Sequence, residues 1–306
     1  MLYLIMLVVY LVMSLGRNLL SGKGIEPPVE LLLILSELVF LVPALIYVLA
    51  RHLSFKEDLG FRPIKAGTFF MCLLLTFLVS PLATFFNVLS QLFVDNTMVR
   101  MSDSLLEGSN IAVLILGALY GPFCEEFVFR SVFNGGYEKL TGPLRAGLIS
   151  AMLFALAHMN LNQAGYTFVL GFIFAIINKA AGSVYPSMVI HICINGANIV
   201  MLMASQAAYK ALGAEADMAM ATQTARESGF LYAAIGVSLV LAVICSLIAV
   251  PCIVFVAKHE GNLEGLKAMF AKPQPKGRWL SVPLVLAVLA ILFIMFGLEP
   301  LLNILQ

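Results

Sequence analysis

The sequence predicts an all-α fold, a polytopic membrane helix bundle of about eight to nine transmembrane helices. Of its 306 residues, 61% are hydrophobic and only 11% are charged, whereas about 25% are charged in an ordinary soluble domain. The apolar residues form long segments without the period-2 alternation of barrel strands, and helices satisfy every backbone polar group in lipid. A soluble enzyme is therefore excluded, and the chain 1–306 is expected to form a single integral-membrane domain.

The predicted helices follow the apolar segments in order. The first segment has no Lys or Arg before Leu15, so it is expected to be an uncleaved span rather than a signal peptide, and the span count depends on it. The third has Pro81 near its middle, which predicts a kink or tilt. The fifth, sixth and seventh follow one another with almost no linker. The segments are 1–20, 31–50, 66–94, 109–129, 146–163, 164–181, 183–204, 231–257 and 281–298.

Charge and cysteine content exclude several classes of protein. The net charge of +1 leaves no basic excess for nucleic acid, so no nucleic-acid partner is expected. Intrinsic disorder is also excluded, because it is accompanied by low hydrophobicity and high charge, and this sequence has neither. The cysteines lie in apolar runs and are expected to be small buried hydrophobic residues rather than a disulfide framework. They are Cys72, Cys124, Cys193, Cys245 and Cys252.

The basic residues between the segments predict the orientation. Alternate connections carry thirteen Lys and Arg on one side and five on the other. The positive-inside rule places the richer side, with connections near 51–65, 130–146 and 258–280, in the cytoplasm. The basic 258–280 connection is expected to lie near anionic lipid. With nine spans, the N-terminus is cytoplasmic, the C-terminus is outside, and a bacterial cell membrane is the expected location.

The densest group of ionisable residues lies at 121–130, in the fourth span. Charged side chains inside a membrane are costly and call for a functional or structural reason. Glu125 and Glu126 are about 100° apart on a helix, so they are not expected to point at one spot. Arg130 follows Glu126 by four residues on the same face. This spacing predicts a structural Glu126–Arg130 ion pair and leaves Glu125 free for a cavity; a plain salt-bridge cluster at a helix end is the alternative.

Two of the four histidines lie in membrane segments. His158 follows Phe154 by four residues and precedes the polar residues Asn160, Asn162 and Gln163. His191 and Asn195 are four residues apart and share a helix face. Taken alone, His158 is more typical of a packing residue than of a catalytic one. His52 and His259 lie in basic connections and are expected at the surface.

These groups are expected to meet in one cavity within the membrane. Counted along their helices, Glu125, His158 and His191 lie roughly 8–18 Å from the same face. One carboxylate and two imidazoles can activate water as a zinc site with these three ligands. They can also do so without metal, with glutamate as general base and His and Asn as oxyanion donors. No HExxH is present, and no other carboxylate except the paired Glu126 is expected near the cavity.

The three motifs, in this order on successive apolar helices, resemble the CPBP family, which contains the type II CAAX prenyl endopeptidases and bacterial Abi-type membrane proteases. The motifs are Glu125-Glu126-x-x-x-Arg130, Phe154-x-x-x-His158 and His191-x-x-x-Asn195. The resemblance covers the catalytic core helices at 109–204, and Asp58–Arg62 is similar to a leader element of such proteins. It implies an intramembrane endopeptidase with a cavity open to the cytoplasm. It also implies Glu125 as water-activating base assisted by His158, with His191 and Asn195 at the oxyanion. The cofactor expectation is none or zinc.

Two other classes of function remain as alternatives. One is a bacteriocin self-immunity or partner-binding membrane protein. The other is a transporter that uses Glu125, His158 and His191 as a proton or cation path, although no inverted repeat is visible. For the protease, the expected partners are membrane lipid and either a peptide or a prenylated or lipidated protein substrate. Glu37 has no evident partner in sequence and is expected to meet another helix or the cavity.

Overall fold

A computed structural model describes residues 1–101, 105, 108–211, 229–271 and 280–298. Every regular element in these ranges is helical, which confirms the predicted fold class. Three stretches are π-helices, labelled η. The elements are α1 Leu2–Ser21, α2 Val29–Ala50, α3 Ala66–Ser90, α4 Thr97–Arg100, α6 Asn110–Ile115, η1 Leu116–Tyr120, α7 Gly121–Glu125, η2 Glu126–Asn134, α8 Gly135–Thr141, α9 Pro143–Ala157, α10 Leu161–Ala181, α11 Tyr185–Ala211, α13 Phe230–Glu260, α14 Leu263–Phe270, α15 Val282–Phe293 and η3 Ile294–Leu298.

Helices occupy all nine predicted segments. In the described part of the chain, seven helices are long and apolar enough to cross a membrane, and Pro143–Ala157 and Val282–Phe296 are shorter apolar helices. Several predicted boundaries are wrong, two of them beside the candidate site. The fourth helical stretch continues to Thr141 rather than ending at 129. The fifth ends at Ala157 rather than 163, because Asn160 caps the next helix by accepting a hydrogen bond from the Gln163 N–H at 2.8 Å.

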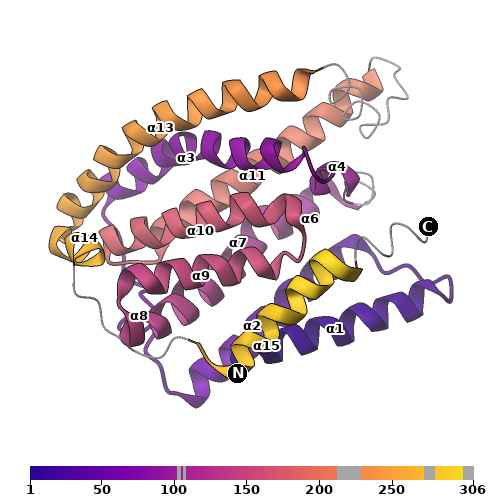
Figure 1. The fold of residues 1–306 in the computed structure, drawn as a ribbon, viewed down its shortest axis with the longest axis horizontal. Helices are drawn as coiled ribbons and strands as arrows, with labels where there is room; N and C mark the ends of the chain where they lie inside the picture. The colour runs from indigo at the N-terminus through magenta and orange to yellow at the C-terminus, as the bar shows by residue number, and fades with distance from the viewer. Residues whose placement is uncertain (102–104, 106–107, 212–228, 272–279, 299–306) are drawn as a thin grey trace.

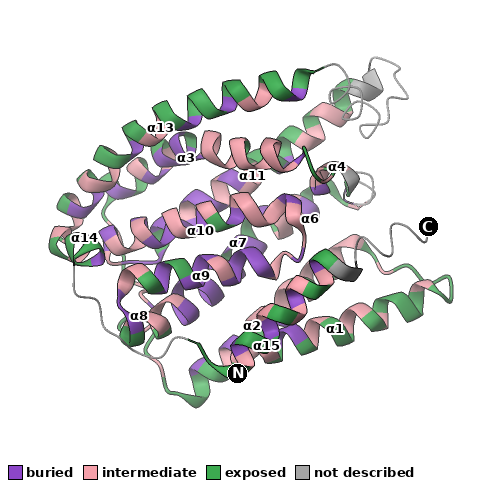
Figure 2. Cartoon of the chain, viewed as in Figure 1, coloured by how far each residue is buried: buried purple, intermediate pink, exposed green. Residues whose placement is uncertain are grey.

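The helices pack in successive layers (Figure 1). Helix α10 lies between α9 and α3, and α13 covers the other side of α3. Helices α1, α2 and α15 pack together beside α9 and η2. Burial is greatest in η2, where eight of nine residues are buried, and along α9, whereas α1 and α13 expose long apolar faces (Figure 2). Such exposed apolar faces suit contact with lipid. The candidate site lies on the more enclosed helices of the bundle.

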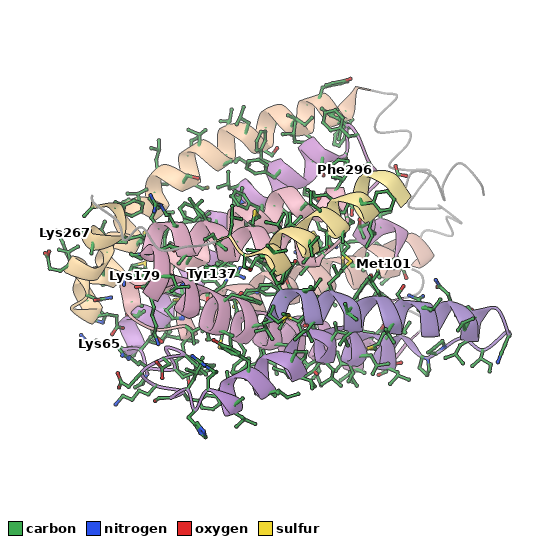
Figure 3. All side chains as sticks on the ribbon, turned by 60° about the horizontal axis from the view of Figure 1, so that its bottom comes forward. Lys65, Met101, Tyr137, Lys179, Lys267 and Phe296 are labelled. Atoms are coloured by element: carbon green, nitrogen blue, oxygen red, sulfur yellow. The ribbon has the colours of Figure 1, made fainter. Side chains whose placement is uncertain are left out.

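The basic connections meet at one end of the molecule. The Lys139 ammonium lies 2.6 Å from the Asp58 carboxylate, and the Lys179 ammonium lies 2.6 Å from Glu138. Lys65, Lys179 and Lys267 lie toward one end of the bundle, and Met101 and Phe296 lie toward the other (Figure 3). The predicted grouping of connections is therefore confirmed, although the basic segment 272–279 lies outside the described residues.

One of these connections, the Asp58–Arg62 segment, is fixed between the core helices. The hydrogen bonds from the Lys139 side chain and the Ser54 N–H hold the pKa of the Asp58 carboxyl below its usual range. Gly60 has a φ of 76°, which favours glycine, and its carbonyl accepts the Val184 N–H at 2.9 Å. The Phe61 ring contacts Phe127 of η2 and Tyr185 of α11. The segment thus joins the start of α11 to η2.

Candidate active site

The helix that carries the two glutamates is irregular where they occur. Glu125 ends α7 and Glu126 begins η2, with η1 one turn before. Pro122 has no backbone N–H and cannot complete an α-helical hydrogen bond at that point. Single π-turns inside α-helices are often found at functional sites. Gly121 and Pro122 therefore lie where the regular α-helix is interrupted, just before the two glutamates.

Glu125, His158 and His191 meet, as the sequence predicts. The His158 Nε2 atom lies 3.8 Å from Glu125 Oε1. The His191 Nε2 atom lies 3.4 Å from Glu125 Oε2. The Glu125 side chain keeps 18% of its surface exposed, so a small molecule such as water can reach the carboxylate.

Each histidine is oriented through its other ring nitrogen. The His158 Nδ1 atom is 2.9 Å from the carbonyl oxygen of Phe154, which can only accept a hydrogen bond, so Nδ1 carries the proton. The His191 Nδ1 atom is 2.9 Å from Glu126 Oε1. Donation to these oxygens places both Nε2 atoms toward Glu125. A hydrogen bond on the far nitrogen is the usual way to fix the orientation of a functional histidine.

The predicted ion pair is present, but Glu126 has a second contact that the sequence did not reveal. The Arg130 Nε atom lies 3.3 Å from Glu126 Oε2, and both side chains are fully buried. Because Glu126 also accepts from His191, the two glutamates flank opposite nitrogens of one imidazole. The two glutamates thus point to different spots, as helix spacing predicts, but both contact the same histidine. His191 lies on another helix, α11, and its two ring nitrogens each approach one of the two glutamates.

Aromatic rings and a glycine enclose the Arg130 guanidinium. Its carbon atom lies 4.2 Å from the ring centre of Phe154 and 5.4 Å from that of Phe174. A Cβ atom on Gly171 would lie 3.1 Å from Arg130 Nη2. A cation over an aromatic face gains electrostatic stabilisation. Phe154, four residues before His158, thus both holds the His158 ring and covers the buried ion pair.

Asn195 lies one turn beyond His191 on α11 and faces another carbonyl. Its side-chain amide donates to the Gly117 carbonyl of η1 at 3.3 Å. Among the described residues, the Asn195 side chain makes no hydrogen bond to Glu125 or to either histidine ring. The amide has two N–H groups, so one remains for a further acceptor. The structure does not bring Asn195 into the same contact network as the other three predicted catalytic residues.

A further carboxylate lies close to the site, contrary to the sequence expectation. Glu37 of α2 points at α7: its Oε1 atom is 3.6 Å from the position of a Cβ on Gly121, one turn before Glu125. Among the described residues, no group donates a hydrogen bond to its buried Oε2 atom. Glu37 therefore meets another helix, as expected. Its position beside the site could not be predicted from the sequence, because α2 and α7 are far apart along the chain.

The zinc alternative has suitable donor types, since imidazole and carboxylate are common zinc ligands. As the side chains are placed, however, no group of three or more His, Cys, Asp or Glu residues could hold a metal ion in the part of the chain that the structure describes.

Comparisons with known proteins cover the same helices. Residues 107–197 match the family model described as type II CAAX prenyl endopeptidase Rce1-like. YdiL of Bacillus subtilis (strain 168), a candidate membrane peptidase, is 27% identical over 89 residues. These are 29% of this chain and 36% of that protein, so the chain spans about a third of the length of this relative. No solved structure matches. The region matched by the family model includes every residue from Glu125 to Asn195.

Proposed function

We propose, from the match of residues 107–197 to the Rce1-like CAAX prenyl endopeptidase family, that the chain is an endopeptidase that cleaves within the membrane. The observation that carries the proposal is the approach of both Nε2 atoms, at 3.8 and 3.4 Å, to the Glu125 carboxylate. A carboxylate next to two oriented imidazoles, with limited access for water, is suited to general-base hydrolysis.

In the proposed reaction, Glu125 activates a water molecule. The carboxylate takes one proton from the water as the water oxygen forms a bond with the carbonyl carbon of the peptide. His158, held by the Phe154 carbonyl, accepts a hydrogen bond from this water through Nε2 and so orients it. The carbonyl oxygen then bears the negative charge of the tetrahedral intermediate.

The same side chains complete the cycle. In the proposed step His191 takes part as an imidazolium that neither gains nor loses a proton: its Nδ1–H is donated to Glu126, its Nε2–H donates to the oxyanion, and the remaining N–H of Asn195 is the second donor. Donors placed where charge develops lower the barrier of acyl transfer. When the C–N bond breaks, the proton held by Glu125 passes to the leaving nitrogen. The first products are a carboxylic acid and an amine, and Glu125 is returned to its starting state; the acid then passes its remaining proton to the amine, which leaves a carboxylate and an ammonium group.

The substrate class follows from the surroundings of the site and from the family. The matching family is described by its action as a prenyl endopeptidase, and the bundle exposes apolar faces to lipid. We infer a peptide or protein substrate with an apolar or prenylated part. Access from the cytoplasm is the favoured orientation, because the basic connections gather at one end.

Comparative proteomics tests this function. Membranes that contain the native chain are compared with membranes that contain the Glu125→Gln chain, and new peptide termini are sought only in the former. A farnesylated CAAX-tail peptide and the same peptide without the lipid are then added to purified protein in water enriched in oxygen-18. Hydrolysis should place one oxygen-18 atom in the new carboxylate. Equal termini in both membranes, with no cleavage of either peptide by the native chain, would contradict the proposal.

A further inference from the structure

The backbone that follows His158 is held in an unusual conformation. His158 is the residue after the last residue of α9, so the helix does not continue beyond it to fix its position. The next residue, Met159, has a φ of 52° although it is not glycine. Residues of this kind persist where surrounding contacts determine the backbone, and they cluster at functional sites. The backbone conformation of this turn is therefore expected to depend on contacts with surrounding residues.

Asn160 makes the first of these contacts. Its side-chain amide donates to the His158 carbonyl at 2.9 Å. Its Oδ1 atom accepts from the Gln163 N–H at 2.8 Å and from the Thr97 hydroxyl at 3.2 Å. One side chain thus joins the backbone of His158 to the first turn of α10 and to α4.

Asn162 anchors the turn to another part of the bundle. The side chain is only 2% exposed, and each of its polar atoms is used. Its Oδ1 atom accepts the Thr97 N–H at 3.0 Å. Its two N–H groups donate to Asn87 Oδ1 and to Ser90 Oγ, both at 2.9 Å. The bonds to Asn87 and Ser90 reach the end of α3, so the α9–α10 turn is fixed to a helix that does not carry the candidate active site.

A purely structural role does not require this chemistry. Helices α9 and α10 already pack along their length, as do α10 and α3, and apolar side chains would fill the same space without buried polar groups. Buried polar groups are tolerated when every donor and acceptor is satisfied, and such networks then select one arrangement. Here the arrangement selected is the one in which His158 Nε2 faces Glu125 at 3.8 Å.

We propose that Asn160 and Asn162 are positioning residues of the active site, which hold the His158–Asn160 turn against α3 and α4 so that the His158 ring keeps its orientation. The proposal rests on the proposed function of His158. Because a displacement of about 1 Å can reduce a rate by about 10²-fold, loss of either side chain should lower kcat.

Nuclear magnetic resonance of protein labelled with nitrogen-15 in histidine tests the proposal without a substrate. The native ring of His158 should give the nitrogen shifts of a single Nδ1–H tautomer. Asn162→Ala and Asn160→Ala should shift or broaden the His158 signals and leave those of His52 and His259 unchanged. Thr167→Val is the matched control, because the hydrogen bonds that this buried α10 hydroxyl makes to described residues go to carbonyls of its own helix, at 2.8 and 3.3 Å. It should leave the His158 signals as they are.

Kinetics with the farnesylated CAAX-tail peptide provides the second arm. Asn162→Ala should lower kcat by roughly 10–10²-fold with little change in KM, whereas Thr167→Val should change neither. If Asn162→Ala does not fold, Ser90→Ala removes one bond to Asn162 and takes its place in both arms. Unchanged His158 signals in the folded Asn variants, or in Ser90→Ala where it replaces Asn162→Ala, would overturn the proposal. Absence of cleavage by the native chain would instead contradict the proposed function and leave the spectroscopic result to decide the role of the turn.

Discussion

Removal of the charge on Arg130 should strongly destabilise the protein, and removal of both charges of its ion pair should not. The pair is fully buried, with 3.3 Å between Arg130 Nε and Glu126 Oε2. Arg130→Met keeps much of the side-chain volume but removes the cation that pairs with the Glu126 carboxylate, which keeps the His191 N–H at 2.9 Å. Glu126→Gln removes the carboxylate that pairs with the guanidinium, which keeps its contacts with the rings of Phe154 and Phe174.

The magnitude follows from the cost of an unpaired buried charge. Loss of one partner of a buried pair costs about 3–5 kcal/mol, whereas replacement of both partners by uncharged groups is often neutral. The double variant Glu126→Gln, Arg130→Met should therefore be more stable than either single variant. The amide oxygen that replaces the carboxylate in this variant can still accept a hydrogen bond from His191. A change of about 3–5 kcal/mol corresponds to a shift in Tm on the order of 10 °C.

Thermal unfolding in one detergent at one scan rate measures the effect, since membrane proteins often unfold irreversibly. The control is the double variant Glu138→Gln, Lys179→Met, whose pair is partly exposed and should contribute only about 0–1 kcal/mol. A loss of Tm in the buried double variant equal to the sum of the two single losses would refute the reasoning, because the two charges would then act independently.

Three further predictions concern packing, pH and metal. Gly171→Ala should lower the free energy of unfolding by about 1–3 kcal/mol, because its Cβ would lie 3.1 Å from both Arg130 Nη2 and Ala151 Cα. An unchanged Tm would contradict this, because α9 and α10 would then move apart without cost. Asp58→Asn should lower Tm at neutral pH, and the difference should vanish as the pH falls through the lowered folded-state pKa of Asp58; a difference that does not vary with pH would contradict the role of the Lys139 contact. Exhaustive chelation should leave cleavage intact, and a loss that added zinc reverses would establish a metal mechanism instead.

The sequence predicts the helices well because hydropathy and length alone determine membrane spans. All nine apolar segments are helical, and the three motifs identify Glu125, His158 and His191, which meet. Helix ends are predicted less well. The apolar character of 146–163 runs on past His158, and only the cap made by Asn160 reveals the true end of α9.

Contacts between distant helices account for what the sequence does not reveal. Helix spacing correctly pairs Glu126 with Arg130, because both lie on one helix. It cannot show that His191, from α11, lies between the two glutamates, or that Glu37, from α2, lies against Gly121. The sequence also does not predict the π-helical turns on either side of α7, which ends at Glu125.

The most direct test of the account is the rate at which Glu125→Gln cleaves a farnesylated CAAX-tail peptide relative to the native chain under single-turnover conditions. The amide keeps the size of the side chain and removes the proton acceptor, and an amide is easier to bury than a carboxylate, so folding and Tm should be nearly unchanged. The account predicts a rate lower by at least the roughly 10²–10⁴-fold expected for loss of a general base. A folded Glu125→Gln protein that retains more than about a tenth of the native rate would contradict the assignment of Glu125 as that base.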